Sequence, residues 1–318
     1  VLCLDVNRRR RWQNGGDRPD LLDAYNHWSG TTANWYVILN TTGTPPPPGS
    51  QISWSLKNSD GFKHQDGEFS LDKTLIPGGP SELGAISCLL PNVDQPTELQ
   101  LEISLNGAGF AITNDWFVYV YPRLPDQLPD LAILDPASIM DEWGEWLSQL
   151  PRLHQNDNLH TYKIIITTIW NHRLENFVQN GGSVILLQQG DGPLPAIRCP
   201  FWRESVLLFP EHEIWETFPH QGYAGLQFFG VASDRAFVSQ EITNVLSSDV
   251  EITPIMRRLD AREFHISDYL FEARTGKGVL LGCSLRLQGG MGAQPFGLER
   301  NVAGGSLFGN IVDYVRSV

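Results

Sequence analysis

The hydrophobic pattern of this chain changes at a proline-rich segment, YPRLPDQLPD, which occupies residues 121–130. Before this segment, apolar and polar residues alternate in short runs, whereas after it apolar runs alternate with stretches of helical spacing. Because each proline disfavours a helix at the preceding residue, the segment is typical of a linker. We therefore expect two domains, residues 1–122 and 131–318, joined by a linker at residues 123–130.

The first domain contains only strand patterns. In the run QISWSLKN, Ile52, Trp54 and Leu56 fall on one face and the residues between them are polar. A period of two is typical of a strand with one face in a core and the other in water. Turn clusters separate the runs, so we expect an all-β sandwich of the immunoglobulin-like type. The other runs of this kind occupy residues 35–40, 82–90, 97–106 and 110–122.

The second domain alternates strands with helices. The stretch 137–150 has apolar residues at helical spacing, and a second helix ends at Gly181 and Gly182, which permit a left-handed C-cap. A closing helix is expected near residues 304–317. This pattern predicts an α/β, doubly wound, three-layer domain of the flavodoxin type. The apolar runs typical of its buried parallel strands occupy residues 131–134, 162–168, 183–189 and 279–285.

Composition excludes several classes of partner. The chain has 36 acidic and 23 basic side chains, a formal net charge of −13, and nucleic acid is bound mainly through basic groups, so we expect no nucleic-acid partner. The apolar runs are far shorter than the roughly 18 residues of a membrane helix, so no membrane partner is expected. The four cysteines form no CxxC pair, which argues against a zinc knuckle or a dense disulfide framework. The start at Val1 shows no signal peptide and is typical of a processed protein or an excised fragment, and it leaves the compartment, cytoplasmic or secreted, open.

One segment combines aromatic and charged residues in a way that suits a sugar. Aromatic faces stack on the C–H side of a sugar ring, and charged or amide groups bind its hydroxyls. The segment follows a parallel strand, and ligands in open α/β sheets bind beyond the carboxyl ends of strands. The alternative is that the tryptophans pack the segment onto the sheet and the charged residues pair locally. The candidate carbohydrate-binding residues are Trp202, Arg203, Glu204, Trp215, His220 and Tyr223.

Three other groups resemble reactive sites but favour ordinary structure. The acidic and histidine-containing run 211–223 has no HxH or HxxxH pair, so we expect no metal site and no cofactor there. Asp141 and Glu145 alternate with Trp143 and Trp146, which favours an amphipathic helix over a carboxylate pair. Residues 276–278, GKG, precede a strand rather than a helix, which favours a hairpin turn over a phosphate loop.

The residues of the second domain carry a resemblance to a known family. The stretch YKIIITT…LENFVQNGGSVILLQQG resembles the core of class I glutamine amidotransferase-like domains. The stretches PFWRESVLLF, GLQFFGVASDRAF and LFEARTGKGVLLGCSL resemble the C-terminal region of glycoside hydrolases of family two, which are similar to β-galactosidases and β-glucuronidases. The resemblance implies that a sandwich and an amidotransferase-like domain follow the catalytic barrel of a longer polypeptide.

The chain departs from the catalytic patterns of both the amidotransferases and the glycoside hydrolases of family two. In active amidotransferases a cysteine with a neighbouring histidine stands on the turn after the strand equivalent to SVILLQQ, but here that turn reads Gln188-Gln189-Gly190. Cys199 lies about ten residues later, next to Pro200. Glycosidases of family two place two glutamates on an eight-stranded barrel, and no barrel fits within 318 residues that already hold two other folds.

The sequence therefore predicts a chain without catalytic residues of its own. We expect an accessory or scaffold region of a glycoside hydrolase that packs on the catalytic barrel of its parent polypeptide, shapes substrate access or mediates homo-oligomerisation. One alternative is a carbohydrate-binding module with its cleft near Trp202 to Tyr223. A second alternative is an independent hydrolase that uses a histidine and an acid around His212 or His220.

Overall fold

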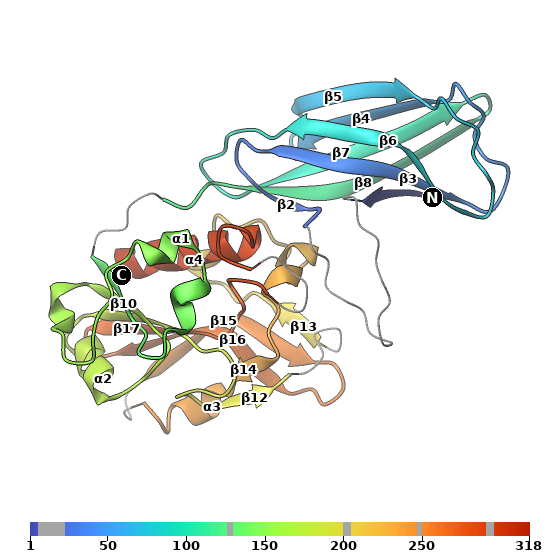
Figure 1. Ribbon diagram of the computed structural model, residues 1–318. Helices are drawn as coiled ribbons and strands as arrows, with labels where there is room; N and C mark the ends of the chain where they lie inside the picture. Colours follow the sequence, from blue (N-terminus) through green and yellow to red (C-terminus); the bar gives the residue numbers. More distant parts are fainter. Residues whose placement is uncertain (6–22, 126–129, 200–204, 247–249, 291–295) are drawn as a thin grey trace. The chain divides into compact units, whose positions relative to one another are not determined.

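The computed structural model describes residues 1–5, 23–125, 130–199, 205–246, 250–290 and 296–318. Strands form most of its regular structure, and helices are few. The chain divides into two compact units, of which the first covers Val1–Arg123 and the second begins at Leu124 (Figure 1).

The first unit consists of two sheets around one core. One sheet has the order β1-β3-β6 and the other β2-β8-β7-β4-β5, and every pair is antiparallel except β2 with β8. Trp35 of the first sheet and Ile52 and Leu101 of the second sheet belong to the same buried cluster, so the unit is a β-sandwich. The strands are β1 (Leu2–Asp5), β2 (Asn26–Trp28), β3 (Thr32–Thr41), β4 (Gln51–Asn58), β5 (Lys63–Ser70), β6 (Gly79–Leu89), β7 (Thr97–Gly107) and β8 (Phe110–Tyr121).

The second unit is built on one nine-stranded mixed sheet. Four strands, in the order β9-β10-β11-β17, are parallel, and the remaining strands pair antiparallel beyond β17. β11 and β17 are neighbours although residues 188–277 separate them in the chain. The strands are β9 (Leu131–Leu134), β10 (Ile164–Thr167), β11 (Ser183–Leu187), β12 (Ala196–Arg198), β13 (Ser205–Leu208), β14 (Arg235–Phe237), β15 (Glu251–Asp260), β16 (Ile266–Thr275) and β17 (Gly278–Cys283).

Helices cover both faces of this sheet (Figure 1). Helix α2 (His172–Gln179) packs Leu174, Phe177 and Val178 on one face, in the same buried cluster as residues of β9, β10, β11 and β17. Helix α4 (Val302–Ser317) lies on the opposite face. The other helical segments are η1 (Ile139–Glu142), α1 (Glu145–Ser148), η2 (Leu159–Thr161), η4 (Glu213–Trp215), η5 (Leu226–Val231) and α3 (Ser239–Ile242).

Several predicted elements are present in the second unit. The four apolar runs form β9, β10, β11 and β17, and the closing helix is α4. Helix α2 ends before Gly181, whose φ of 99° is the left-handed conformation expected there. Residues 276–278 form the turn between β16 and β17, which pair antiparallel from Thr275 opposite Gly278. The predicted doubly wound, three-layer α/β domain is not shown, because the sheet is mixed and five of its nine strands belong to its antiparallel portion.

The helix predicted at residues 137–150 is wrong. Two short pieces, η1 and α1, replace it, and Gly144 between them has a φ of 132°, which no helix contains. The backbone N–H of Trp146 donates to Glu299 Oε1 at 2.6 Å, so a distant carboxylate binds the first turn of α1. Asp141 lies 3.1 Å from Arg152 in an exposed ion pair instead of on an amphipathic helix with Glu145.

Candidate functional site

The parallel strands β11 and β17 end side by side, and we call this border of the sheet the carboxyl edge. Ligands of open α/β sheets bind at such an edge, so it is the first place to look for a site. The backbone N–H of Gln188 donates to Cys283 O at 2.9 Å, which keeps the two strand ends together. The loops that follow begin with Gln188 and Gln189 after β11 and with Ser284 after β17.

Two glutamine amides close the loop after β11. Gln188 is buried, and its Nε2 donates to Leu194 O at 2.9 Å while its Oε1 accepts from Leu194 N at 3.0 Å. Gln189 Nε2 donates to Leu285 O at 2.8 Å, which ties this loop to the one after β17. An amide has no nucleophilic lone pair of the kind that attacks a carbonyl, so these side chains fasten the backbone of the loop after β11 and do not act as nucleophiles.

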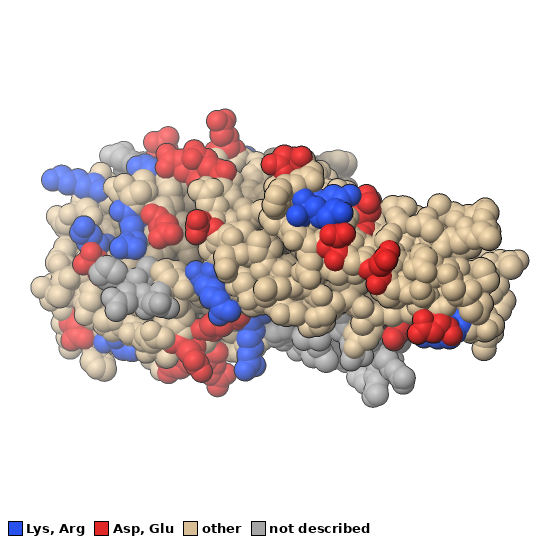
Figure 2. All heavy atoms as spheres, turned by 90° about the horizontal axis from the view of Figure 1, so that it is seen from above, with Lys and Arg blue, Asp and Glu red and all other residues tan. Residues whose placement is uncertain are grey.

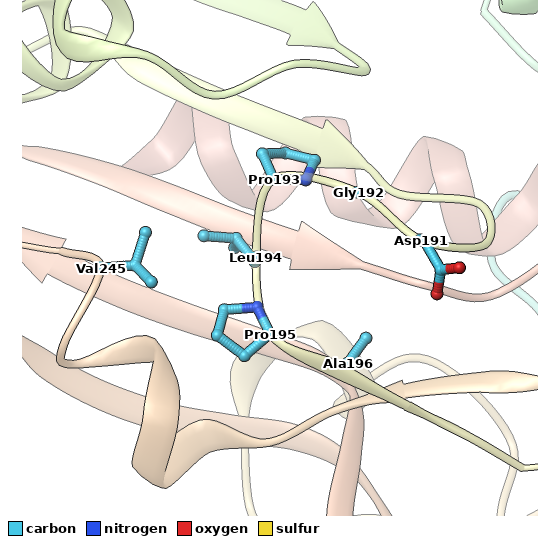
Figure 3. Close-up of a pocket in the computed structure, with 7 residues that line it drawn as sticks. All are labelled: Asp191, Gly192, Pro193, Leu194, Pro195, Ala196 and Val245. Carbon is cyan, nitrogen blue, oxygen red and sulfur yellow. The ribbon is translucent and has the colours of Figure 1, made fainter.

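A shallow pocket of about 240 Å³ lies beside this loop. Residues 191–196 and Val245 line it, with Val245 at one end and Asp191 at the other (Figure 3). Asp191 is the one charged side chain among the described residues that line it, and its carboxylate lies 3.0 Å from Arg235 Nη2. Prolines and backbone form most of the wall, so the pocket offers few groups that could orient a substrate.

The cysteines of the second unit are not nucleophiles in this structure. Cys199 and Cys283 are free, and both are buried. Burial raises the pKa of the Cys199 thiol and raises the pKa of the Cys283 thiol to about 12, so both are protonated at neutral pH. Among the described residues, the charged groups that act on Cys199 are Arg258, Asp260 and Arg235, and none of them is a histidine.

Trp215, a predicted sugar-binding residue, belongs to a core. Its side chain is 3% exposed and lies 4.3 Å from the ring of Phe209, and its indole N–H donates to Ile255 O at 2.7 Å. The rings of Phe218, His220 and Phe228 complete the cluster. The indole is therefore buried in packing the segment onto β15, which is the alternative that the sequence left open.

The other predicted sugar-binding residues are spread out. Tyr223 is 49% exposed, and its hydroxyl donates to Gln221 Oε1 at 3.1 Å. The Nδ1 of His220 accepts from Gly222 N at 2.9 Å, and burial lowers the pKa of its imidazole. The candidates Trp202, Arg203 and Glu204 lie outside the described residues.

The structure reveals a buried polar cluster that the sequence did not predict. Glu272 on β16 is 2% exposed and accepts hydrogen bonds from Tyr314 of α4 and from Arg274 Nε. His212 Nδ1 accepts from Ile214 N, so its proton is on Nε2, which lies 3.8 Å from Glu272 Oε2. The cluster joins β16, α4 and the segment that begins η4. An acidic residue inside the apolar run LFEARTG is the sequence signal that could have indicated it.

These contacts set the ionisation of Glu272. Burial alone would raise the pKa of its carboxyl, but His212, 3.8 Å away, and the hydrogen bonds from Tyr314 and Arg274 outweigh burial and lower the pKa. Burial and the neighbouring Glu272 raise the pKa of Tyr314 to about 12, so the phenol keeps its proton and stays a donor. Glu272 is therefore an ionised carboxylate that accepts hydrogen bonds from Tyr314 and Arg274 and lies near His212. These contacts keep α4 and residues 212–215 on the sheet.

The lowered pKa of Glu272 gives a pH-dependent stability. Because the folded-state pKa lies below the unfolded value of about 4.3, the stabilisation is full above that value and is lost as the pH falls through the folded pKa. We expect Glu272→Gln to lose about 2 kcal/mol of unfolding free energy at pH 7, with a smaller loss relative to wild type at pH 3. Urea unfolding at both pH values measures this. Glu241→Gln, at an exposed position on α3, is the control and should show no such difference.

The described residues contain no group of three or more histidine, cysteine, aspartate or glutamate side chains placed to hold a metal. In the run 211–223, His212 faces Glu272 whereas His220 packs on Phe209, so these two imidazoles do not converge. On the face drawn in Figure 2, basic side chains of the described residues stand among carboxylates rather than in one basic patch. None of the described helices is both long and apolar enough to span a membrane.

Two family models match parts of the chain. One, described as a domain of unknown function (DUF8488), matches residues 34–122. The other, also described as a domain of unknown function (DUF8487), matches residues 165–318. No curated protein matches the chain.

Solved structures give weak similarities. A β-glucuronidase from Parabacteroides merdae is 10% identical over 49% of this chain and 22% of that one, with a TM-score of 0.22. A family 123 glycoside hydrolase from Clostridium perfringens is 13% identical over 51% and 32%, with a TM-score of 0.19. A β-glucuronidase from Bifidobacterium dentium is 8% identical over 59% and 30%, with a TM-score of 0.20. The matched regions span a third or less of these proteins, and TM-scores this low carry no argument about function. The amidotransferase resemblance gains no support from these matches and stays a prediction.

Proposed function

We propose that this chain is a non-catalytic accessory region of a carbohydrate-active enzyme, composed of an immunoglobulin-like sandwich and a degenerate amidotransferase-like domain. Its role is to pack against a catalytic barrel, to shape substrate access or to mediate oligomerisation. The carbohydrate context rests on the sequence resemblance to glycoside hydrolases of family two. One structural observation supports the absence of catalysis: Gln188 and Gln189 fasten backbone at the turn where a nucleophile would stand.

The neighbouring groups support the same proposal. A thiol attacks an amide only as a thiolate beside a base, and Cys199 is a buried, protonated thiol among arginines and an aspartate. Glu272 has the histidine and tyrosine neighbours of a general base, but all its contacts are inside the fold and the carboxylate is 2% exposed. A substrate atom needs to come within hydrogen-bond reach of a general base, and here α4 and residues 212–215 occupy that space.

The purified chain tests the absence of catalysis. We expect no turnover of aryl β-galactosides, aryl β-glucuronides or L-glutamine above a blank without protein. Turnover that persists through purification and is lost in His212→Ala or His220→Ala would instead favour an independent hydrolase. Loss in Gln189→Ala would place a reactive centre on the loop after β11.

The accessory role has its own test. Calorimetric titration with β-linked oligosaccharides distinguishes a scaffold, which we expect to give no saturable heat, from a carbohydrate-binding module. Saturable binding that Tyr223→Ala weakens would favour the module. The coding sequence upstream of Val1 supplies a second observation: we expect a barrel-sized segment there, and a gene without one would contradict the proposal.

A further inference from the structure

Four buried side chains and the partly buried side chain of Arg235 gather around residues 233–235, which lead into β14. The backbone of this segment receives hydrogen bonds from its neighbours: Cys199 N donates to Asp234 O at 2.7 Å, and the Tyr269 hydroxyl donates to Ser233 O at 3.2 Å. Ser284 Oγ, at the end of β17, donates to Arg235 O at 3.0 Å, so the segment lies at the carboxyl edge. The five side chains, called the arginine cluster below, are those of Cys199, Arg235, Arg258, Ser267 and Tyr269.

Two members of the arginine cluster are paired across the sheet. Arg258 of β15 is directly opposite Ser267 of β16, so their side chains project from the same face. Arg258 is 4% exposed and Ser267 is 1% exposed. Arg258 Nη2 bonds Asp260 Oδ2 at 2.7 Å, but Arg258 Nε is buried without a hydrogen-bond partner. The buried Ser267 hydroxyl lies beside the Cys199 thiol, a weak partner that leaves most of its hydrogen-bonding capacity unused.

Like Arg258, both Arg235 and the adjacent Arg286 have one guanidinium nitrogen near a carboxylate and at least one buried nitrogen without a hydrogen-bond partner. Arg235 Nη2 lies 3.0 Å from Asp191 Oδ1, whereas Arg235 Nε and Nη1 are buried without partners. Arg286 Nη2 lies 3.5 Å from Asp234 Oδ1, and Arg286 Nε is again buried without a partner. Native proteins leave few buried donors unpaired, and a water or ion usually accounts for them. Three guanidinium groups and one hydroxyl therefore present unused donors around one segment.

We propose that Arg258 and Ser267, together with Arg235, bind a small oxyanion: the carboxylate, sulfate or phosphate group of a ligand. Guanidinium N–H groups and a hydroxyl are donors that match oxyanions, and arginine is the residue most used for them. The location beyond the ends of β11 and β17 is where α/β sheets take their ligands. The proposal does not depend on the accessory role proposed above.

The other groups around the site are compatible with an anion. Burial raises the pKa of the Cys199 thiol and of the Tyr269 phenol, so both stay neutral and neither repels a negative charge. The carboxylates that face these arginines are Asp191, Asp234 and Asp260, and each is within ion-pair distance of one guanidinium. Since charge is balanced pair by pair, recognition rests on the unused N–H and O–H donors. We therefore expect the affinity of the site to differ from one anion to another when the anions are compared at the same ionic strength.

The test measures the melting temperature of the full chain while sodium phosphate, sulfate, acetate or glucuronate replaces chloride at constant ionic strength. A ligand that binds only the folded state raises the melting temperature in a saturable way, and we expect at least one of these oxyanions to do so. Comparing the melting temperatures in acetate and glucuronate with those in sulfate and phosphate shows which kind of oxyanion the site binds. A response equal to that of chloride for all four would overturn the proposal.

Two variants localise the effect. Ser267→Ala removes a hydroxyl whose neighbour is the weakly bonding Cys199 thiol, so we expect it to fold as wild type does and to weaken the response at least threefold. Arg258→Met should abolish the response, and Arg316→Met, at a surface ion pair on α4, should leave it unchanged. A wild-type response retained in both Ser267→Ala and Arg258→Met would overturn the assignment to this site, even if Arg258→Met is destabilised.

Discussion

Replacing Gly278 with alanine is expected to destabilise the second unit by about 3 kcal/mol. A Cβ at this position would lie 2.0 Å from Gly182 O and 2.4 Å from Val178 O. Both are backbone atoms, at the end of α2 and at the turn into β11, so neither can rotate away as a side chain could. The clash would separate β17 from the helix end that packs beside it, and urea unfolding of the full chain measures the loss.

Gly225→Ala is the matched control for this substitution. Gly225 has a φ of −83°, which alanine adopts freely, and nothing lies within 4 Å of its ideal Cβ. We expect its unfolding free energy to change by no more than about 0.5 kcal/mol. Equal losses in Gly278→Ala and Gly225→Ala would mean that the close approach of α2 to β17 is not a determinant of stability.

Trp215→Ala is expected to cost about 4 kcal/mol of unfolding free energy. The substitution removes a 3%-exposed indole from the cluster of Phe209, Phe218 and Phe228, and it leaves Ile255 O without its donor. Truncating a large buried aromatic leaves a cavity that the surrounding rings fill only in part. Thermal and urea unfolding both measure the loss.

Tyr223→Ala separates packing from ligand binding at this segment. Tyr223 is 49% exposed, so we expect a change within about 0.5 kcal/mol. If Trp215 were a ligand-binding residue without a packing role, Trp215→Ala would also leave the unfolding free energy unchanged. That result would contradict the core described here and restore Trp215 as a candidate for sugar stacking.

The strands of the first unit follow from sequence where each carries a buried face. The runs that contain Trp35 or Leu101 alternate apolar and polar residues and lie in β3 and β7. β5, with the sequence KHQDGEFS, has no buried residue, so its pattern contains no signal of a core. It forms because β4 offers it a backbone to pair with, and such pairing is invisible in the residues of β5 themselves.

The second unit shows a different limit of sequence reasoning. Local signals located β10, α2 and its glycine cap, because these depend on residues near one another in the chain. The helix predicted at 137–150 failed because Glu299 binds Trp146 N, and the carboxyl group of Glu299 lies where a Cβ of residue 144 would be. No pattern within 137–150 reveals a partner so distant in sequence.

Like the fold of the second unit, the candidate sites could be predicted from the sequence only in part. The absence of a nucleophile after β11 could be read from Gln188-Gln189, but the hydrogen bonds of these amides to Leu194 and Leu285 could not. The sequence left open whether Trp215 packs or binds, and its burial required the fold. Arg258 and Ser267 are nine residues apart on two strands, and only the β15–β16 register places them opposite each other.

The separation of β11 and β17 in the chain has a consequence for the order of folding. These neighbouring strands can pair only after residues 188–277 have brought their ends together. Long-range pairing loses chain entropy before it gains contacts, and parallel strands form slowly for this reason. During synthesis β9, β10 and β11 leave the ribosome well before β17, so the edge of β11 stays unpaired until most of the chain exists. Until β17 pairs with it, the exposed edge of β11 is a place where premature association with another chain would begin.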